Sequence, residues 1–330
     1  MLNRVSSRPV FVLGIVLLGL ASGCAGEDLS RSNYQRTTVT AEAGSGQGGV
    51  PAGPITDPAF GLSALRSVDP CELLSGDDVI GDLGTVSDEP YESEWGSCRV
   101  DVQDAGGKTV EVGVDLGASP MGVDPTGAIE GLPFLENKLD DVTCYSTAIY
   151  SEQPALGVTV QTGYQGGNPC DVGYTTLQKV VRALRAEPAK YDVPAGSLLE
   201  ADPCASADEA VLAQVLGGSP KRMAMGLHKC DLSFGAEPTI SVRFRAGYPP
   251  DTTDGGTEVD LGGGVKAIQE PGSTDTAECS VEWVHRPGED GANELATVDY
   301  YDYNDGASKD DACSRALEVA KSVAPKLPTA

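Results

Sequence analysis

The chain has 330 residues and carries 49 acidic against 23 basic side chains, so its net charge is −26 at pH 7. This excess of acid argues against a nucleic-acid partner, because binding to phosphates needs a basic face. Only 5% of the residues are aromatic, yet a hydrophobic content of 40% is enough to build a core, and we expect two cores.

The first 23 residues are predicted to be a secretory signal peptide. Two arginines precede a short apolar run, which ends in Ala21-Ser22-Gly23-Cys24. This order is typical of an export signal, and the run is about half the roughly 20 residues that a membrane-spanning helix needs. The Ala-Ser-Gly-Cys ending resembles a bacterial lipobox, in which the cysteine is acylated. We therefore expect a lipoprotein that is cleaved before Cys24 and anchored through Cys24 to the extracytoplasmic face of the cell membrane.

A flexible tether is predicted to follow the lipidated cysteine. Residues 24–60 are rich in Gly, Ala, Ser, Thr and Pro. A chain of this composition behaves as a random coil whose root-mean-square reach is roughly 30–36 Å. The tether would hold the folded part away from the lipid headgroups.

The remaining chain is predicted to be a tandem repeat. Asp69-Pro70-Cys71 recurs as Asp202-Pro203-Cys204, and in each an N-cap residue followed by proline is typical of a helix start. Apolar residues follow both openings at helical spacing. Each opening also contains a sequence that resembles a capping box. These boxes are Ser75 with Asp78 and Ser206 with Glu209.

Each repeat continues with strands and closes with a helix. Val110, Val112, Val114 and Leu116 alternate with Glu111, Gly113 and Asp115, and Ile240, Val242 and Phe244 alternate with Ser241, Arg243 and Arg245. This period of two predicts half-buried strands and an antiparallel sheet with one polar face. Further strands are expected near 143–150, 156–163, 279–285 and 295–303. Apolar stripes at the same offsets after Cys170 and Cys313 predict a closing helix in each repeat.

We therefore predict an α+β fold of two tandem disulfide-stapled repeats, each an antiparallel sheet packed by helices near its ends. The first domain is expected at 61–188 and the second at 197–327, with a linker at 189–196 and a tail at 328–330.

Eight cysteines remain after Cys24, an even number that indicates a disulfide framework in an exported chain. Eight cysteines allow 105 pairings, so the pairing stays open. The first two cysteines of the repeats are 27 and 26 residues apart, which favours the same bond made twice. We expect the bonds Cys71–Cys98, Cys144–Cys170, Cys204–Cys230 and Cys279–Cys313.

Several motifs resemble an actinobacterial lipoprotein family with DUF3558 domains. They are Asp-Pro-Cys-x-Leu-Leu-Ser at 69–75, Trp95-x-x-Cys98 and the closing cysteine with its helix. The resemblance covers 61–188 well and 197–327 less well, where Leu227 stands in the place of Trp95. That family resembles in turn the extracellular sensor domain of mycobacterial serine/threonine kinases. The resemblance implies a sandwich-like α+β domain and no established chemistry.

No catalytic motif is present in the sequence. There is no G-x-S-x-G and no phosphate-binding glycine loop, and the only two histidines, His228 and His285, are interpreted as structural or surface residues. The acidic segment 299–306 lacks the register of a calcium-binding EF-hand loop. We expect no metal, no cofactor and no enzymatic activity, although an acid pair among the many carboxylates stays open.

The predicted function is a non-enzymatic binding or sensing module with an unknown small-molecule or envelope-protein ligand. One alternative is a ligand-capture protein that feeds a transporter, and a second is an unrecognised envelope hydrolase. A groove between two similar domains is a common ligand site. Trp95 is the candidate ligand contact, with packing beside the Cys71–Cys98 bond as the alternative.

Overall fold

The computed structural model describes residues 49–51, 53–120, 124–253, 255–272, 277–288, 292–304 and 306–329. The predicted signal peptide, Cys24 and most of the predicted tether lie outside these residues. Within them, no helix is both long enough and apolar enough to cross a membrane.

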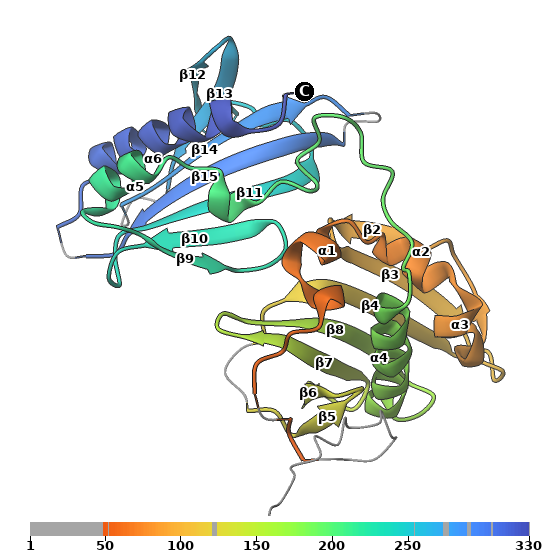
Figure 1. Cartoon of the computed structure of the whole chain (residues 1–330). Coiled ribbons are helices and arrows are strands. Elements are labelled where there is room, and N and C mark those ends of the chain that lie inside the picture. The colour runs from red at the N-terminus through yellow and green to blue at the C-terminus, as the bar shows by residue number, and fades with distance from the viewer. Residues whose placement is uncertain are drawn as a thin grey trace, which may run out of the picture. The chain divides into compact units, whose positions relative to one another are not determined.

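The first half of the folded chain is one antiparallel sheet with helices before and after it (Figure 1). Its helices are α1 (Leu62–Arg66), α2 (Pro70–Ser75), α3 (Asp77–Ile80) and α4 (Pro169–Arg185). Its strands are β1 (Thr85–Val86), β2 (Tyr91–Glu94), β3 (Ser97–Gln103), β4 (Thr109–Ala118), β5 (Gly127–Ile129), β6 (Leu132–Lys138), β7 (Thr143–Glu152) and β8 (Ala155–Tyr164). The strand order is β1-β3-β4-β8-β7-β6-β5, and β2 pairs with β3.

The second half repeats this plan. Its helices are α5 (Glu209–Leu216) and α6 (Lys309–Val323). Its strands are β9 (Lys221–Ala224), β10 (Lys229–Ser233), β11 (Thr239–Gly247), β12 (Thr257–Gly262), β13 (Val265–Pro271), β14 (Ala277–Arg286) and β15 (Asn293–Asp302). The order β9-β10-β11-β15-β14-β13-β12 matches β2-β3-β4-β8-β7-β6-β5 of the first sheet strand for strand. The predicted α+β fold of two tandem repeats is confirmed.

One face of each sheet packs against the closing helix and forms a core. In the first half the predicted stripe of α4 is almost fully buried, with Leu177, Val180 and Val181 at 0% exposure. In the second half Val319, Ala320 and Val323 of α6 are likewise at 0%. Burial of these apolar stripes is the main stabilising contribution of each core. We call the opposite face of each sheet its open face.

Four disulfide bonds join the eight cysteines in the predicted pairs. They are Cys71–Cys98, Cys144–Cys170, Cys204–Cys230 and Cys279–Cys313. In each half, one bond ties the opening segment to a sheet strand, and the other ties a later strand to the closing helix. Loops of 26 to 34 residues contribute roughly 3 kcal/mol per bond in the chain-entropy model.

The opening helices differ from the prediction. In the first half Asp69 caps α2 as expected, but the helix ends at Ser75 because Gly76 is extended, and α3 follows as a separate turn. In the second half Asp202 caps only a single 3₁₀ turn, and α5 is capped by Asp208.

Both predicted capping boxes are wrong. The Ser75 hydroxyl donates to the Glu72 carbonyl, and the Ser206 hydroxyl donates to the Pro203 carbonyl. A serine that bonds back to the preceding turn is at a helix end and is not available to cap the next helix.

Candidate functional site

The open face of the first sheet carries a cavity of about 320 Å³. Two cross-strand rows of side chains form its floor, and both rows run over β3, β4, β8, β7 and β6. The first row is Ser97, Asp115, Thr159, Thr147 and Leu135, and the second row is Arg99, Gly113, Gln161, Tyr145 and Asn137. We call this cavity the open-face pocket.

Gly113 is the reason that this floor is hollow. It lies in the middle of β4, between Arg99 on β3 and Gln161 on β8, and it has no side chain to fill the row. A Cβ placed on Gly113 would make only ordinary contacts, at 3.5 Å from Arg99 Cγ and 3.8 Å from Gln161 Cβ. The guanidinium of Arg99 reaches across this gap and donates to Gln161 Oε1 at 3.2 Å. The pocket therefore lies beside a fixed polar bridge.

Asp115 is the half-buried acid of the pocket. Its Oδ1 accepts a hydrogen bond from the Gly117 backbone N–H at 2.8 Å. Burial raises the pKa of the Asp115 carboxyl to about 6, opposed by this hydrogen bond and assisted by the negative charge of Glu94. Among the described residues, no lysine or arginine pairs with Asp115. The carboxyl is therefore held in a site that penalises its charge without a protein cation to offset it.

Apart from Glu94 and Arg99, the rest of the pocket wall is neutral. Thr147 and Thr159 share a hydrogen bond of 2.7 Å between their hydroxyl oxygens. The apolar part of the lining comes from Ala118, Pro120 and Leu135, although Leu135 itself is only 4% exposed. Convergent hydroxyl and amide groups around an apolar patch are typical of a small-molecule site.

A larger space of about 570 Å³ lies farther along the same face, and Asp101, Lys108 and Glu111 are among its lining residues. Lys108 and Glu111 are exposed. A groove of exposed charged groups holds water and offers no apolar patch to a ligand. The open-face pocket is the better candidate.

Trp95 does not reach the open-face pocket. It lies in the turn between β2 and β3 and meets the ring of His228 edge-on, with 5.3 Å between ring centroids. It packs against the hydrophobic core of the second half, while Leu227, at the same offset before its cysteine, is 4% exposed and packs into the core of the first half. Ala224 of the second half also belongs to the core of the first, so each half contributes apolar side chains to the core of the other.

A second cavity, of about 290 Å³, is lined by residues of both halves, including Trp95, His228 and Arg243. His228 is buried, and its Nε2 is 2.7 Å from the Leu199 carbonyl. Burial lowers the pKa of His228 to about 4, so the ring is neutral at pH 7. His285 lies on β14 with Nε2 at 2.9 Å from the Gly196 carbonyl. Each histidine therefore bonds a backbone carbonyl, as expected of a structural residue.

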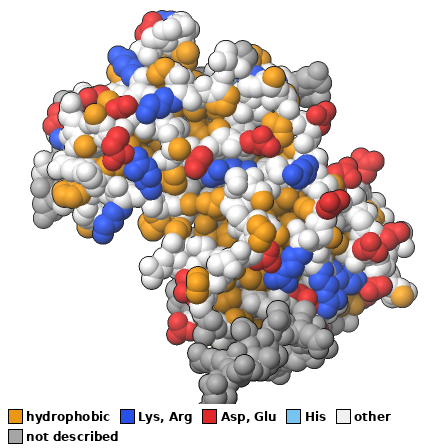
Figure 2. All heavy atoms as spheres, viewed as in Figure 1, with side chains coloured by type: hydrophobic (Ala, Val, Ile, Leu, Met, Phe, Trp, Pro, Cys, Tyr) orange, Lys and Arg blue, Asp and Glu red, His pale blue; other side chains and the backbone are white. Residues whose placement is uncertain are grey.

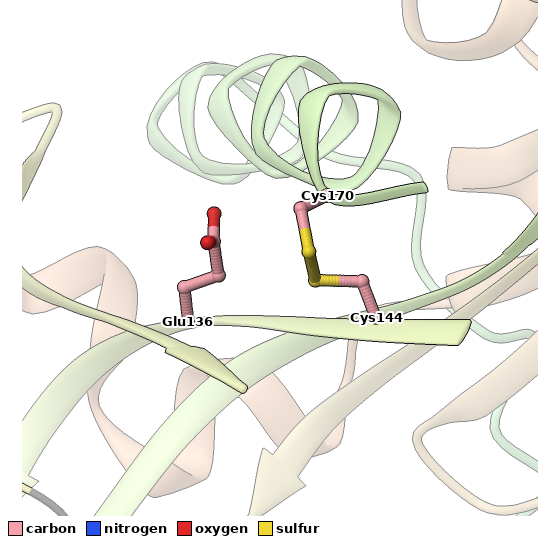
Figure 3. A group of neighbouring side chains, drawn as sticks. All are labelled: Glu136, Cys144 and Cys170. Carbon is pink, nitrogen blue, oxygen red and sulfur yellow. A yellow bond between two sulfur atoms is a disulfide. The ribbon is translucent and has the colours of Figure 1, made fainter. Parts of the chain in front are cut away.

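Figure 3 shows a group of three potential metal ligands, Glu136, Cys144 and Cys170. The two cysteines are joined in a disulfide, so neither sulfur is a thiolate, and one carboxylate alone does not make a metal centre. In the acidic segment 299–306, Asp302 Oδ1 accepts from the Asn304 backbone N–H, as in a turn. Asp305 of that segment lies outside the described residues.

No family model and no curated protein matches this chain. Two solved structures are found by the structural comparison. DynU16, a protein from the dynemicin biosynthetic locus, is 15% identical, with 84% of this chain and 94% of that chain covered and a TM-score of 0.15. The di-domain ARO/CYC protein BexL from the BE-7585A biosynthetic pathway is 10% identical, with 85% and 97% covered and a TM-score of 0.13. At these scores neither likeness supports an argument about function.

The open-face pocket is not predicted by the sequence. Strand alternation marks Gly113 and Asp115 only as positions on a polar face, and it does not assign their partners on β6, β7 and β8. Comparison of the two repeats gives a signal for these positions. Where the first half has Gly113 and Asp115, the matching strand of the second half has Ser241 and Arg243.

Proposed function

We propose that this protein is a membrane-tethered extracytoplasmic lipoprotein of the DUF3558 type that acts as a non-enzymatic binding or sensing module. Its ligand is a small molecule held in the open-face pocket. The observation that carries the proposal is the cavity of about 320 Å³ on the polar face of the first sheet, which combines apolar side chains with an acid that has no cationic partner among the described residues. Four disulfides support an address outside the cytoplasm, where such bonds persist.

The experiment is the recovery of a bound small molecule with the mature chain purified from its own envelope, measured by native mass spectrometry. Gly113→Val places two methyl groups in the hollow and is expected to abolish the added mass. Gly127→Val is the matched control, because Gly127 also lies on a strand and a Cβ there meets nothing within 4 Å. Unchanged ligand recovery with Gly113→Val would contradict the proposal.

The membrane address has its own test. Replacing Cys24 with alanine removes the acylation site, so the chain is expected to leave the membrane fraction and to lose its acyl mass. A wild-type chain without an acyl group that still sediments with membranes would contradict lipid anchoring.

A second candidate function, envelope hydrolysis, is favoured by one observation. Asp115 has a pKa of about 6 and lies close enough to Glu94 for their charges to interact. A carboxyl with a raised pKa beside a second carboxyl is the arrangement that enzymes use for general acid–base catalysis. Turnover of a glycoside panel at pH 5 to 6 that disappears in Asp115→Asn would establish this function. Absence of turnover in the wild type leaves the binding function as the proposal.

A further inference from the structure

The chemistry of the open-face pocket indicates which class of ligand it accepts, provided that the proposed function holds. Asp115 uses one oxygen for the Gly117 backbone and has no cationic partner among the described residues. A buried carboxylate without a partner is costly, and a ligand that brings a positive charge removes that cost. Asp115 is therefore the group that selects the ligand.

The residues around Asp115 favour a cation and disfavour an anion. Glu94 lines the same cavity and adds a second negative charge. Arg99, the one arginine in the lining, donates to the neutral Gln161 Oε1 and keeps its charge, so the two acids and Arg99 together leave the lining with one net negative charge. The net charge of −26 also raises the local concentration of cations around the whole chain.

We propose that the open-face pocket binds a small organic cation, whose ammonium or guanidinium group pairs with Asp115 while its body lies over the neighbouring Thr159 and Thr147. The hydroxyls of Ser97, Thr147 and Thr159 line the same wall and can accept or donate further hydrogen bonds.

The cation requirement makes binding dependent on pH. The titratable and charged groups near Asp115 are Glu94 on β2, Arg99 on β3 and Tyr150 on β7. Asp115 and Glu94 also line the adjoining cavity, whose other lining residues include the cations Lys229, Arg243 and Arg245. Because the pKa of Asp115 lies near 6, the ligand is expected to bind more weakly as the pH falls from 7 to 5.

The test compares benzylamine with benzyl alcohol and benzoate, three probes of nearly equal size that differ in charge. Binding to the purified mature chain is measured by calorimetry at pH 7.5. Benzylamine is expected to bind at least about tenfold more tightly than benzyl alcohol, and Asp115→Asn is expected to remove that difference. Glu111→Gln is the matched control, because Glu111 lies on the same strand and the same face but outside the pocket.

The outcomes separate this inference from the proposed function. Equal binding of benzylamine and benzyl alcohol, or full benzylamine affinity in Asp115→Asn, overturns the cation inference and leaves a neutral-ligand pocket. Benzylamine binding that is unaffected by Gly113→Val overturns both, because the probe is then bound elsewhere. If none of the three probes binds, the cation inference fails, and ligand recovery from the envelope decides the function separately.

Discussion

The open faces of the two sheets occupy equivalent positions and have opposite character. Cys98 pairs with Val114 and Cys230 pairs with Val242, which aligns the two sheets residue by residue. In this alignment Gly113 corresponds to Ser241, which is 1% exposed, and Asp115 corresponds to Arg243. The second face thus has the Ser241 side chain where the first has only the hydrogen of Gly113. It also has the positive charge of Arg243 where the first has the negative charge of Asp115.

The same alignment pairs Thr147 with Glu282. Thr147 bonds only to the hydroxyl of Thr159, whereas Glu282 accepts from Arg245 at 2.7 Å and from Thr297 at 2.8 Å. The second open face is therefore a network of protein charges, while the first leaves its acid without a partner. The two sheets share one strand order, and their open faces differ in the charges they carry. Figure 2 shows acidic and basic side chains interspersed over the visible surface.

The largest expected effect concerns the cores on which the two faces rest. Trp283 is 1% exposed and corresponds to Ala148 in the first half. Trp283→Ala should lower the free energy of unfolding by about 3–5 kcal/mol, because it leaves a cavity that the core cannot fill. Ala148→Gly should cost about 1 kcal/mol. Urea unfolding of the oxidised chain, followed by circular dichroism, measures both. A loss of about 1 kcal/mol or less with Trp283→Ala would contradict its place in the core of the second half.

Acid should affect the two halves in opposite directions. His228 has a pKa lowered to about 4, so the stability it contributes is complete above its unfolded value near 6.5 and is lost as the pH falls toward 4. Asp115 has a pKa raised to about 6, so its contribution is complete below its unfolded value of 3.8 and is lost as the pH rises through 6. Each group should change the free energy of unfolding by on the order of 2 kcal/mol across its pH range, after solvent screening.

Unfolding free energies of three chains at pH 4, 5, 6 and 7 separate these two contributions. In the wild type, His228 makes the free energy of unfolding rise as the pH rises from 4 to 6.5, and this rise should be absent in His228→Gln. Asp115 makes it fall as the pH rises from 3.8 to 6, and this fall should be absent in Asp115→Asn. Parallel curves for all three chains would show that neither group has a shifted pKa.

The polar network of the second face should be more costly to break than the threonine pair of the first. Glu282→Gln weakens the bonds to Arg245 and Thr297 and should lower the free energy of unfolding by about 1–2 kcal/mol. Thr147→Val removes one neutral hydrogen bond and should cost about 0.5–1 kcal/mol. Thermal unfolding of the two variants side by side tests the order, and a larger loss for Thr147→Val would reverse it.

The smallest effect is expected from exchanging the two equivalent small residues. Gly113→Ser should change stability by less than about 0.5 kcal/mol, because its Cβ has room at 3.5 Å or more from its neighbours. Ser241→Gly should cost about 1 kcal/mol, since glycine weakens a strand interior. The same denaturation assay checks both. A large loss with Gly113→Ser would mean that the hollow is needed for folding rather than for a ligand.

Strand periodicity in the sequence predicted much of this fold correctly. The alternation at 110–116 and at 240–245 indicated strands with one polar face, and the structure places these residues on β4 and β11. The stripes after Cys170 and Cys313 predicted α4 and α6. These predictions succeed because a period of two or of 3.6 reports directly which face of an element is buried.

Predictions that depended on single residues at helix ends were less successful. Ser75 and Ser206 have the composition of caps, yet both bond back into the preceding turn. The glycine at position 76 decides where α2 ends, and Asp208 caps α5 in place of Ser206. Local bonds of this kind compete within a few residues, so composition alone does not select among them.

The sequence by itself determined the class of the fold: a duplicated α+β chain with two disulfide bonds in each half. Only the tertiary structure decided where a ligand could bind. The open-face pocket joins residues of six strands, from Ser93 on β2 to Gln161 on β8, through cross-strand register. Side chains far apart in sequence become neighbours only when the strands pair, and a missing side chain such as that of Gly113 makes a cavity only when its neighbours are in place.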